Sequence, residues 1–328
     1  MRTGFMAILF CLGALATPAP LLAQLAQGVQ WAPERPIRVV LPFVPGSSYD
    51  SIMRMLAEPL GVSLKQAVIV DNRAGASGII GADIVAKAAP DGHTLAFLGD
   101  NHLIFPAIGK QTPYDLFRDF APLMRVAKLD NVVVSHASLP AQTLKELIAL
   151  FKANPGKYKF GSGGQAGTTH LAGELFALLA GVNILHVPYK GGSTAVTGML
   201  GNEVNMMVAN MVVIKPLVAS GRLRAYAVAA NKRSDHLPGV PSTAEAGLPG
   251  LEVPQFYALF APARTPGPVI TRLENELKQI VTAAAFRTRV ESQGADVVAS
   301  DPRELAAFLK QQLAGYRKTA QAADIKAE

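Results

Sequence analysis

The sequence predicts a two-domain α/β fold, in which strands alternate with helices within each domain. Three observations carry this prediction. Short apolar runs of strand length lead into loops rich in glycine and small hydroxyl residues, and amphipathic helical stretches follow these loops. The same pattern starts again near Asn131. A chain of 328 residues, half of them apolar, is also long enough to build two separate cores.

Residues 1–26 differ from the rest of the chain, and we expect them to be a secretory signal peptide. Arg2 supplies a positive end, residues 5–15 are mostly apolar, and cleavage is expected near Ala23 or Ala26. The stretch is too short and too poorly flanked to serve as a membrane anchor. The single cysteine, Cys11, falls in this segment, so the mature protein is expected to have no thiol and no disulfide.

The first α/β unit is expected to contain three strands and two helices. Its first helix follows a turn-rich loop and is expected to kink or end near Pro59, because proline cannot donate a backbone hydrogen bond. Such alternation is typical of a largely parallel sheet that is covered on both faces. The expected elements are strand 36–41, a helix with Ile52 and Leu56 on its buried face, strand 67–70, helix 79–88 and strand 94–98.

The second unit repeats this pattern with different loops. Thr143 and Glu146 form a capping box that opens one of its helices. The expected elements are strand 131–134, helix 144–151, helix 168–179, strand 184–187, helix 195–200 and strands 204–208 and 223–229.

Two helices are expected near the end of the chain, covering the first domain. Thr265 and Pro266 precede residues 269–281, and a second capping box at Asp301 and Glu304 precedes an apolar stripe that includes Leu305. We therefore divide the mature chain into lobe 1, residues 27–131 plus 255–328, and lobe 2, residues 132–254.

Four glycine-rich loops precede expected helices, at residues 46–48, 75–78, 161–169 and 191–194. Helix N-termini offer unpaired N–H groups and partial positive charge, which suit a carboxylate or a phosphate. In open α/β sheets such loops lie at the carboxyl ends of the strands, where ligands bind. The four loops together predict a shared cleft between the two domains.

Catalytic, metal and cofactor sites are not expected. No Gly-x-Ser-x-Gly motif occurs, and none of the six histidines pairs with another at metal-binding spacing. Residues 161–166 loosely match a dinucleotide-binding fingerprint but lack the acidic residue that would bind the ribose. The net charge of +7 is scattered along the chain, so nucleic-acid binding is not expected.

The sequence leaves both a structural role and a ligand-binding role open for Asp50 and for His170. Asp50 lies in the first turn of the first helix, where it either stabilises the helix or hydrogen-bonds the ligand. His170 lies in the first turn behind a glycine-rich loop, where it either hydrogen-bonds the protein or reaches the ligand.

Six segments resemble motifs of the Bug (TctC-type) periplasmic receptors of tripartite tricarboxylate transporters. They are PFVPGSSYD at 42–50, DNRAGASGIIGA at 71–82, AAPDGHTL at 88–95, THLAGELF at 169–176, HVPYKG at 186–191 and LPGVPSTAEAG at 237–247. They occur in the family's order and cover nearly all of the mature chain.

The resemblance implies a type II periplasmic-binding-protein fold, in which two α/β lobes close on a ligand like a Venus flytrap. It also implies a monomer that captures a small carboxylate or a related polar solute and delivers it to membrane permease subunits. The positions that match the family's ligand loops are Phe43, Ser47, Ser48, Asp50, Asp100, Asn101, Gly164, Thr168, Thr169, Tyr189, Lys190 and Asn210. A receptor that feeds a signalling kinase, or a secreted hydrolase or isomerase on the same fold, is the alternative.

Three residues depart from the family pattern. Ser47 replaces the second glycine of a usual pair, and Tyr49 replaces a small residue. Tyr49 is expected to narrow the pocket or to stack on a ring of the ligand. Asp100 stands where relatives carry small residues, and its charge would repel a carboxylate. This departure favours an amide, an aromatic acid or a zwitterion over a simple dicarboxylate.

Overall fold

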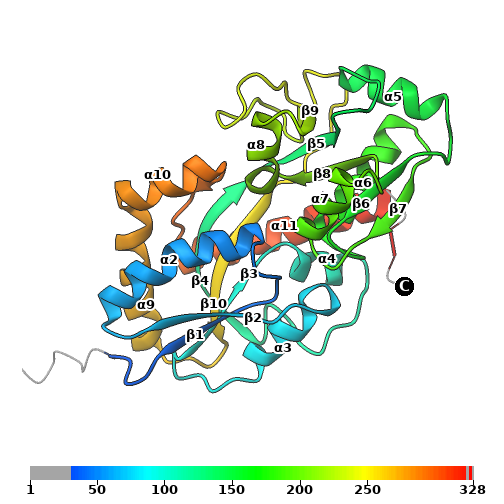
Figure 1. Ribbon diagram of the computed structural model, residues 1–328. Helices are drawn as coiled ribbons and strands as arrows, with labels where there is room; N and C mark the ends of the chain where they lie inside the picture. Colours follow the sequence, from blue (N-terminus) through cyan, green and yellow to red (C-terminus); the bar gives the residue numbers. More distant parts are fainter. Residues whose placement is uncertain (1–30, 323–324, 327–328) are drawn as a thin grey trace, which may run out of the picture.

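The computed structural model describes residues 31–322 and 325–326, whose strands form two separate sheets. Helices cover both faces of each sheet (Figure 1). We call the six-stranded sheet with its helices lobe 1, and the five-stranded sheet with its helices lobe 2. The expected signal peptide, residues 1–26, lies outside the described residues. None of the described helices is both long enough and apolar enough to span a bilayer.

Lobe 1 has the strand order β11-β4-β10-β3-β1-β2. Its strands are β1 (Ile37–Leu41), β2 (Val68–Asn72), β3 (Thr94–Leu98), β4 (Phe120–Leu129), β10 (Gln255–Pro262) and β11 (Asp296–Val297). Its helices are α2 (Ser48–Leu64), η1 (Ala76–Gly78), α3 (Ile79–Ala86), α4 (Asn101–Ala107), α9 (Gly267–Thr282), α10 (Ala284–Gln293) and α11 (Pro302–Ala322). The C-terminal helices pack on this lobe, as the sequence predicts.

Lobe 2 has the strand order β7-β6-β8-β5-β9. Its strands are β5 (Asn131–His136), β6 (Lys159–Ser162), β7 (Leu185–Pro188), β8 (Met206–Asn210) and β9 (Leu223–Val228). Its helices are α5 (Leu144–Lys152), α6 (Thr168–Ala180), α7 (Gly192–Leu200) and α8 (Met211–Ala219).

Both sheets are mixed, so the expectation of largely parallel sheets is wrong. The βα repeats do form parallel pairs, β1 with β2 and β3, and β6 with β7 and β8. The strands next to the crossings between the lobes run the other way: β10 is antiparallel to β3 and β4, and β5 is antiparallel to β8 and β9. A strand that enters a sheet from the neighbouring lobe is not bound to the direction that a βαβ connection imposes.

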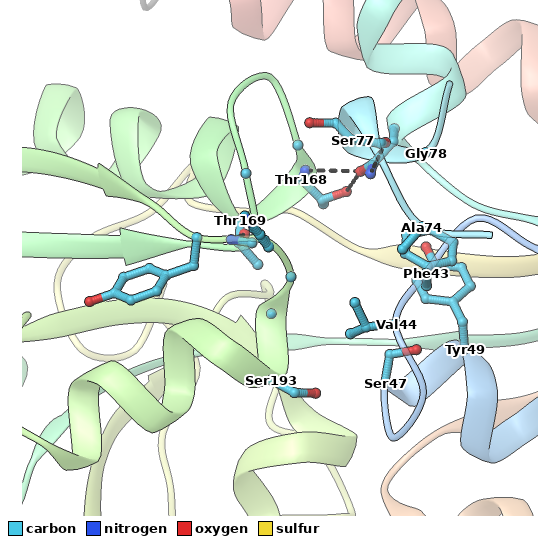
Figure 2. A pocket seen from close by; sticks show the side chains of 18 of the residues that line it. Phe43, Val44, Ser47, Tyr49, Ala74, Ser77, Gly78, Thr168, Thr169 and Ser193 are labelled. Carbon is cyan, nitrogen blue, oxygen red and sulfur yellow. Dashed lines mark hydrogen bonds between the residues drawn. The ribbon is translucent and has the colours of Figure 1, made fainter. Parts of the chain in front are cut away.

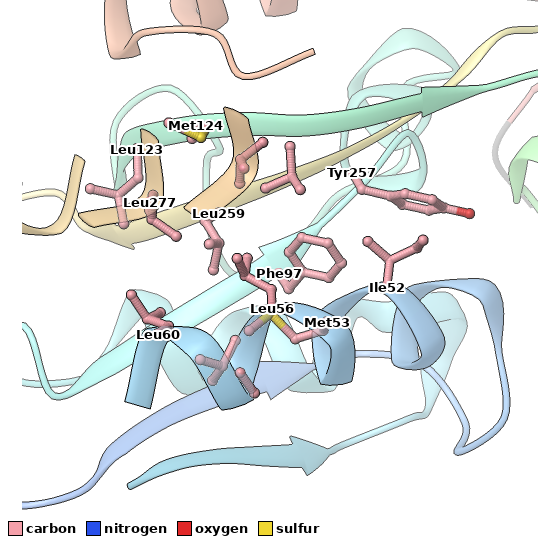
Figure 3. Packing of buried hydrophobic residues seen from close by; sticks show 14 of the residues in the cluster. Ile52, Met53, Leu56, Leu60, Phe97, Leu123, Met124, Tyr257, Leu259 and Leu277 are labelled. Atoms are coloured by element: carbon pink, nitrogen blue, oxygen red, sulfur yellow. The ribbon is translucent and has the colours of Figure 1, made fainter. Parts of the chain in front are cut away.

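Helix α2 packs its apolar face on the lobe 1 sheet. Figure 3 shows Leu56 and Leu60 directed toward strand residues that include Phe97, and all three side chains are fully buried. Burying each such side chain contributes about 1.5–3 kcal/mol to folding. This burial explains why α2 does not end at Pro59 but continues to Leu64, at the cost of one backbone hydrogen bond.

The chain crosses between the sheets twice within the described residues. β4 ends at Leu129 and β5 begins at Asn131, whereas β10 re-enters lobe 1 at Gln255. Gln255 pairs with Leu129 in the β10–β4 ladder, so the two crossings lie side by side. The Asn131 side chain donates a hydrogen bond to the Val253 carbonyl (2.6 Å) and ties them together. This pair of crossings forms the hinge between the lobes.

Candidate functional site

A cavity of about 640 Å³ lies between the two lobes, where loops from both sheets meet. Figure 2 shows Val44 and Ser47 of lobe 1 facing Thr169 and Ser193 of lobe 2 across it. Ten of the twelve expected site residues line this cavity: Phe43, Ser47, Ser48, Asn101, Gly164, Thr168, Thr169, Tyr189, Lys190 and Asn210. Asp50 and Asp100 do not.

Asp50 holds the first loop in place from behind. Its carboxylate accepts hydrogen bonds from the backbone N–H of Gly46 (3.0 Å), from Arg54 (3.0 Å) and from the Asn72 amide (3.0 Å). Burial alone would raise the pKa of Asp50, but the hydrogen bonds and the Arg54 charge outweigh it and lower that pKa. Ser47 caps α2 by accepting from the Asp50 N–H (3.3 Å). Of the two interpretations of Asp50, the structural one matches these contacts.

Tyr49 is part of the cavity lining and packs against Phe43. Its ring stacks on Phe43 with centroids 3.7 Å apart, and only 6% of the residue is exposed. Its hydroxyl lies against Gly99, where any larger residue would collide with it. Burial raises the pKa of Tyr49, so the phenol stays neutral. Tyr49 therefore holds the Phe43 ring in place in the cavity wall.

Asp100 lies in the core of lobe 1, which corrects the expectation that it faces the cleft. It is fully buried, and its carboxylate accepts hydrogen bonds from the backbone N–H of Phe256 (3.1 Å) and from the Tyr316 hydroxyl. Helix α11 carries Tyr316 and closes over this group. Burial raises the pKa of Asp100 to about 7. This carboxyl group does not line the cavity, so Asp100 does not disfavour a dicarboxylate there.

Hydrogen bonds join the lobes along one side of the cavity. The Asn101 side-chain oxygen of lobe 1 accepts from the N–H (3.3 Å) and the hydroxyl (3.1 Å) of Thr168 in lobe 2. The Ser77 hydroxyl donates to the Gln165 carbonyl (2.9 Å). On another edge, the Ser193 hydroxyl donates to the Gly46 carbonyl (3.3 Å). The lobes are therefore in a closed arrangement.

The glycine-rich loop before α6 is held by residues of its own lobe. The Thr169 hydroxyl accepts from the Gly163 N–H (2.8 Å), and Nδ1 of His170 accepts from the Ala166 N–H (3.2 Å). Ala166 has a positive φ of 57°, a conformation that favours glycine and therefore needs support. His170 is 6% exposed and absent from the cavity lining. Of its two interpretations, the hydrogen bond within the protein is the one that these contacts match.

The fold brings together three potential metal ligands, although no two histidines have metal-binding spacing in the sequence. Ligand atoms of His170, Glu174 and His186 lie within 4.8 Å of one another. Nδ1 of His170 accepts a backbone N–H, so the ring proton of the neutral form lies on Nε2, where a metal would need the lone pair. The two imidazoles also stack at 3.9 Å and 21°, so a shared ion would lie outside both ring planes.

This arrangement supports the loop better than it suits a metal ion. His186 hydrogen-bonds the Ser162 hydroxyl (2.6 Å) at the start of the same loop. Burial and the neighbouring His170 lower the pKa of His186 to about 4, so its ring is neutral near pH 7.

Tyr189 and Lys190 contribute differently to the cavity. The Tyr189 hydroxyl donates to Glu203 (2.8 Å), and its ring packs over Gly198, so its phenol is not available to a ligand. Partial burial and Glu203 raise the pKa of Tyr189. Lys190 is exposed and is the only charged residue in the lining described for the cavity.

Asn210 lines the end of the cavity nearest the hinge, but its side chain is committed to the protein. It bonds Gln255, Tyr257 and the Val212 N–H. Gln255 lines the same end and was missed, as was Val213, whereas Ser77, Gln165 and Ser193 lie in loops that the sequence predicts to line the cleft. The available signal for Gln255 was a polar residue at the start of an otherwise apolar strand.

The chain resembles proteins of one family throughout most of its length. Residues 52–324 match the sequence model of the tripartite tricarboxylate transporter family receptor, TctC. Protein BugT of Bordetella pertussis is 36% identical over 287 residues, which cover 86% of this chain and 87% of BugT.

Two similar structures were solved with a ligand. An R. palustris protein with adipate is 30% identical, has a TM-score of 0.86 and aligns over 90% of this chain and 99% of its own. MatC from Rhodopseudomonas palustris, with bound malate, is 27% identical, has a TM-score of 0.83 and aligns over 88% and 99%.

Proposed function

This chain belongs to the tripartite tricarboxylate transporter receptor family, and we propose that it captures a small dicarboxylate between its lobes for delivery to a membrane permease. The proposal places it in the periplasm after removal of residues 1–26. The observation that carries it is a cavity in which helix N-termini from both lobes converge, with one lysine and no carboxylate in the described lining.

The helix N-termini offer hydrogen-bond donors that the protein itself does not use. Helix α2 begins at Ser48, and α7 begins at Gly192. None of the described residues accepts a hydrogen bond from the backbone N–H groups of Ser48, Tyr49, Gly192 or Ser193. Such groups, aided by the helix dipole, favour a negative charge by about 0.3–1 kcal/mol each at exposed sites and by more when partly buried. Each lobe therefore presents an anion-binding end.

A ligand with two carboxylates fits two such ends on opposite lobes. The relatives solved with adipate and with malate hold acids of this kind. The cavity is larger than either acid, which leaves room for ordered waters at about 30 Å³ each to complete the hydrogen bonding. No step of this proposal makes or breaks a covalent bond.

The closed arrangement supports a clamp that works through the hinge. A dicarboxylate that touches both lobes makes all its contacts only when they are closed, so binding shifts the population toward the closed form. We propose that the permease recognises the surface formed by closure.

Calorimetry with small-angle scattering tests this function. We expect adipate or malate to bind the mature protein and to reduce its radius of gyration. The variant K190M should bind the diacid more weakly, and its affinity should change less with salt concentration, because Lys190 is the charged residue of the lining. The matched control K159M removes an exposed lysine outside the cavity and should bind normally. Binding without compaction contradicts the clamp, and a failure to bind any carboxylate contradicts the function.

A further inference from the structure

The hydrogen bonds at the hinge end of the cavity determine how the Asn210 amide is oriented. Its Oδ1 accepts from the backbone N–H of Val212 (3.0 Å), which can act only as a donor. The other end of the amide must therefore be Nδ2. Its two hydrogens point to Gln255 Oε1 (2.5 Å) and to the Tyr257 hydroxyl oxygen (3.0 Å).

The orientation of Gln255 follows from that of Asn210. Because Asn210 donates to it, the atom of Gln255 at that contact is Oε1, and the NH₂ group occupies the other branch of the amide. Gln255 is 6% exposed and lines the cavity, and none of the described residues accepts a hydrogen bond from its Nε2. Its Nε2 is not among the fully buried side-chain atoms that lack a partner, so it remains accessible from the cavity. The cavity therefore presents an unpaired NH₂ donor to which an oxygen of the ligand can hydrogen-bond.

The remaining lining makes this end unsuitable for a cation. The described lining contains neither aspartate nor glutamate. Asp50 is engaged by Arg54 behind the first loop, and Asp100 is sealed beneath α11. An ammonium group placed next to Gln255 would meet an NH₂ donor and no counter-charge, and leaving it so buried would be costly.

We propose that Gln255 is a specificity-determining residue. Its NH₂ group hydrogen-bonds an oxygen of the ligand at the hinge end, so the cavity accepts carboxylates that carry hydroxyl or no substituents and rejects the corresponding amino acids. This selectivity rests on the proposed function, because it concerns the ligand of the same cavity.

Pairs of acids that differ by one group test the selectivity. Malate and aspartate differ only in a hydroxyl and an ammonium group, and adipate and 2-aminoadipate differ only in the ammonium. Calorimetry on the wild-type protein should show the unaminated member of a pair binding at least about tenfold more tightly. A preference for aspartate over malate overturns the proposal.

Two variants test the residue itself. Q255E keeps the oxygen that accepts from Asn210 and replaces the NH₂ group by a second, negatively charged oxygen. It should weaken diacid binding about ten- to a hundredfold and reduce the ratio between the affinity for the diacid and the affinity for the matching amino acid. Q255M removes the amide and should also weaken binding about tenfold. Q311E, on the exposed face of α11, makes the same change of charge outside the cavity and should bind as the wild type does.

The outcomes separate this proposal from the function on which it rests. Thermal melts should show that Q255E and Q311E remain folded. If the wild type binds diacids and folded Q255E binds them within twofold of it, the role of Gln255 is wrong although the function stands. If the wild type binds no carboxylate, the function and the selectivity are both wrong.

Discussion

Replacing Asp100 by asparagine removes a buried carboxyl group that titrates near neutral pH. The site tolerates the change: the new side-chain oxygen accepts from the Phe256 N–H, and the new NH₂ group meets the Tyr316 hydroxyl. That hydroxyl can then donate fully to the Pro254 carbonyl, which already lies 3.3 Å from it. The variant therefore isolates the cost of ionising Asp100.

The direction of the pKa shift of Asp100 gives the sign of this cost, and the size of the shift gives its magnitude. Burial raises the pKa of Asp100 from 3.8 to about 7. Below pH ~4 both the folded and the unfolded chain hold the proton. Between about pH 4 and 7 only the folded chain holds it, so stability falls as the pH rises. At 1.36 kcal/mol for each pKa unit, the loss is on the order of 4 kcal/mol.

Urea unfolding of both proteins, followed by circular dichroism from pH 4 to 8, measures this contribution. The stability of D100N relative to the wild type should rise by a few kcal/mol across the range. The control D119N should show a flat difference, because hydrogen bonds from Arg118 and from the Asp115 N–H lower the pKa of Asp119 to about 2. A flat difference for D100N would refute the assignment of a neutral buried carboxyl group.

Two further predictions concern packing and closure. G99A should lose about 1–3 kcal/mol of unfolding free energy, because its methyl group collides with the Tyr49 hydroxyl, and adding Y49F to G99A should recover part of that loss in thermal melts. N101A should bind ligand about tenfold more weakly in calorimetry, because it removes the hydrogen bonds to Thr168 across the lobes. N154A, whose amide donates within lobe 2, should leave affinity unchanged, and equal affinities for the two variants would contradict a role for Asn101 in closure.

The sequence predicted the architecture because its signals are local. Strand-to-helix loops are marked by glycines and capping residues such as Thr143, which caps α5 as expected. Loops at the carboxyl ends of neighbouring strands meet wherever a sheet forms, so the expected loops do gather around one cavity. Asn210 lies in the lining of this cavity, but its side chain hydrogen-bonds Gln255 and Tyr257 near the hinge.

The errors arose where distant segments meet. Asp100 is buried by Tyr316, which lies 216 positions away in the sequence, and no local pattern indicates such a contact. His170 and His186 belong to different elements and become neighbours only when α6 packs over β6 and β7. Gln255 is the one polar side chain at the start of an apolar strand, but this local signal does not say that the strand end reaches the cavity.

The two crossings between the lobes have a consequence for the shape that the protein presents to others. Because they are paired side by side at Leu129 and Gln255, they form a single two-stranded connection, about which the proposed clamp would bend. In the proposed clamp, ligands of different chemistry would then close the lobes about the same connection. Under this proposal the outer surface of the closed form would depend on whether the cavity is occupied and little on which ligand occupies it, so the lining could change while the permease contact is kept.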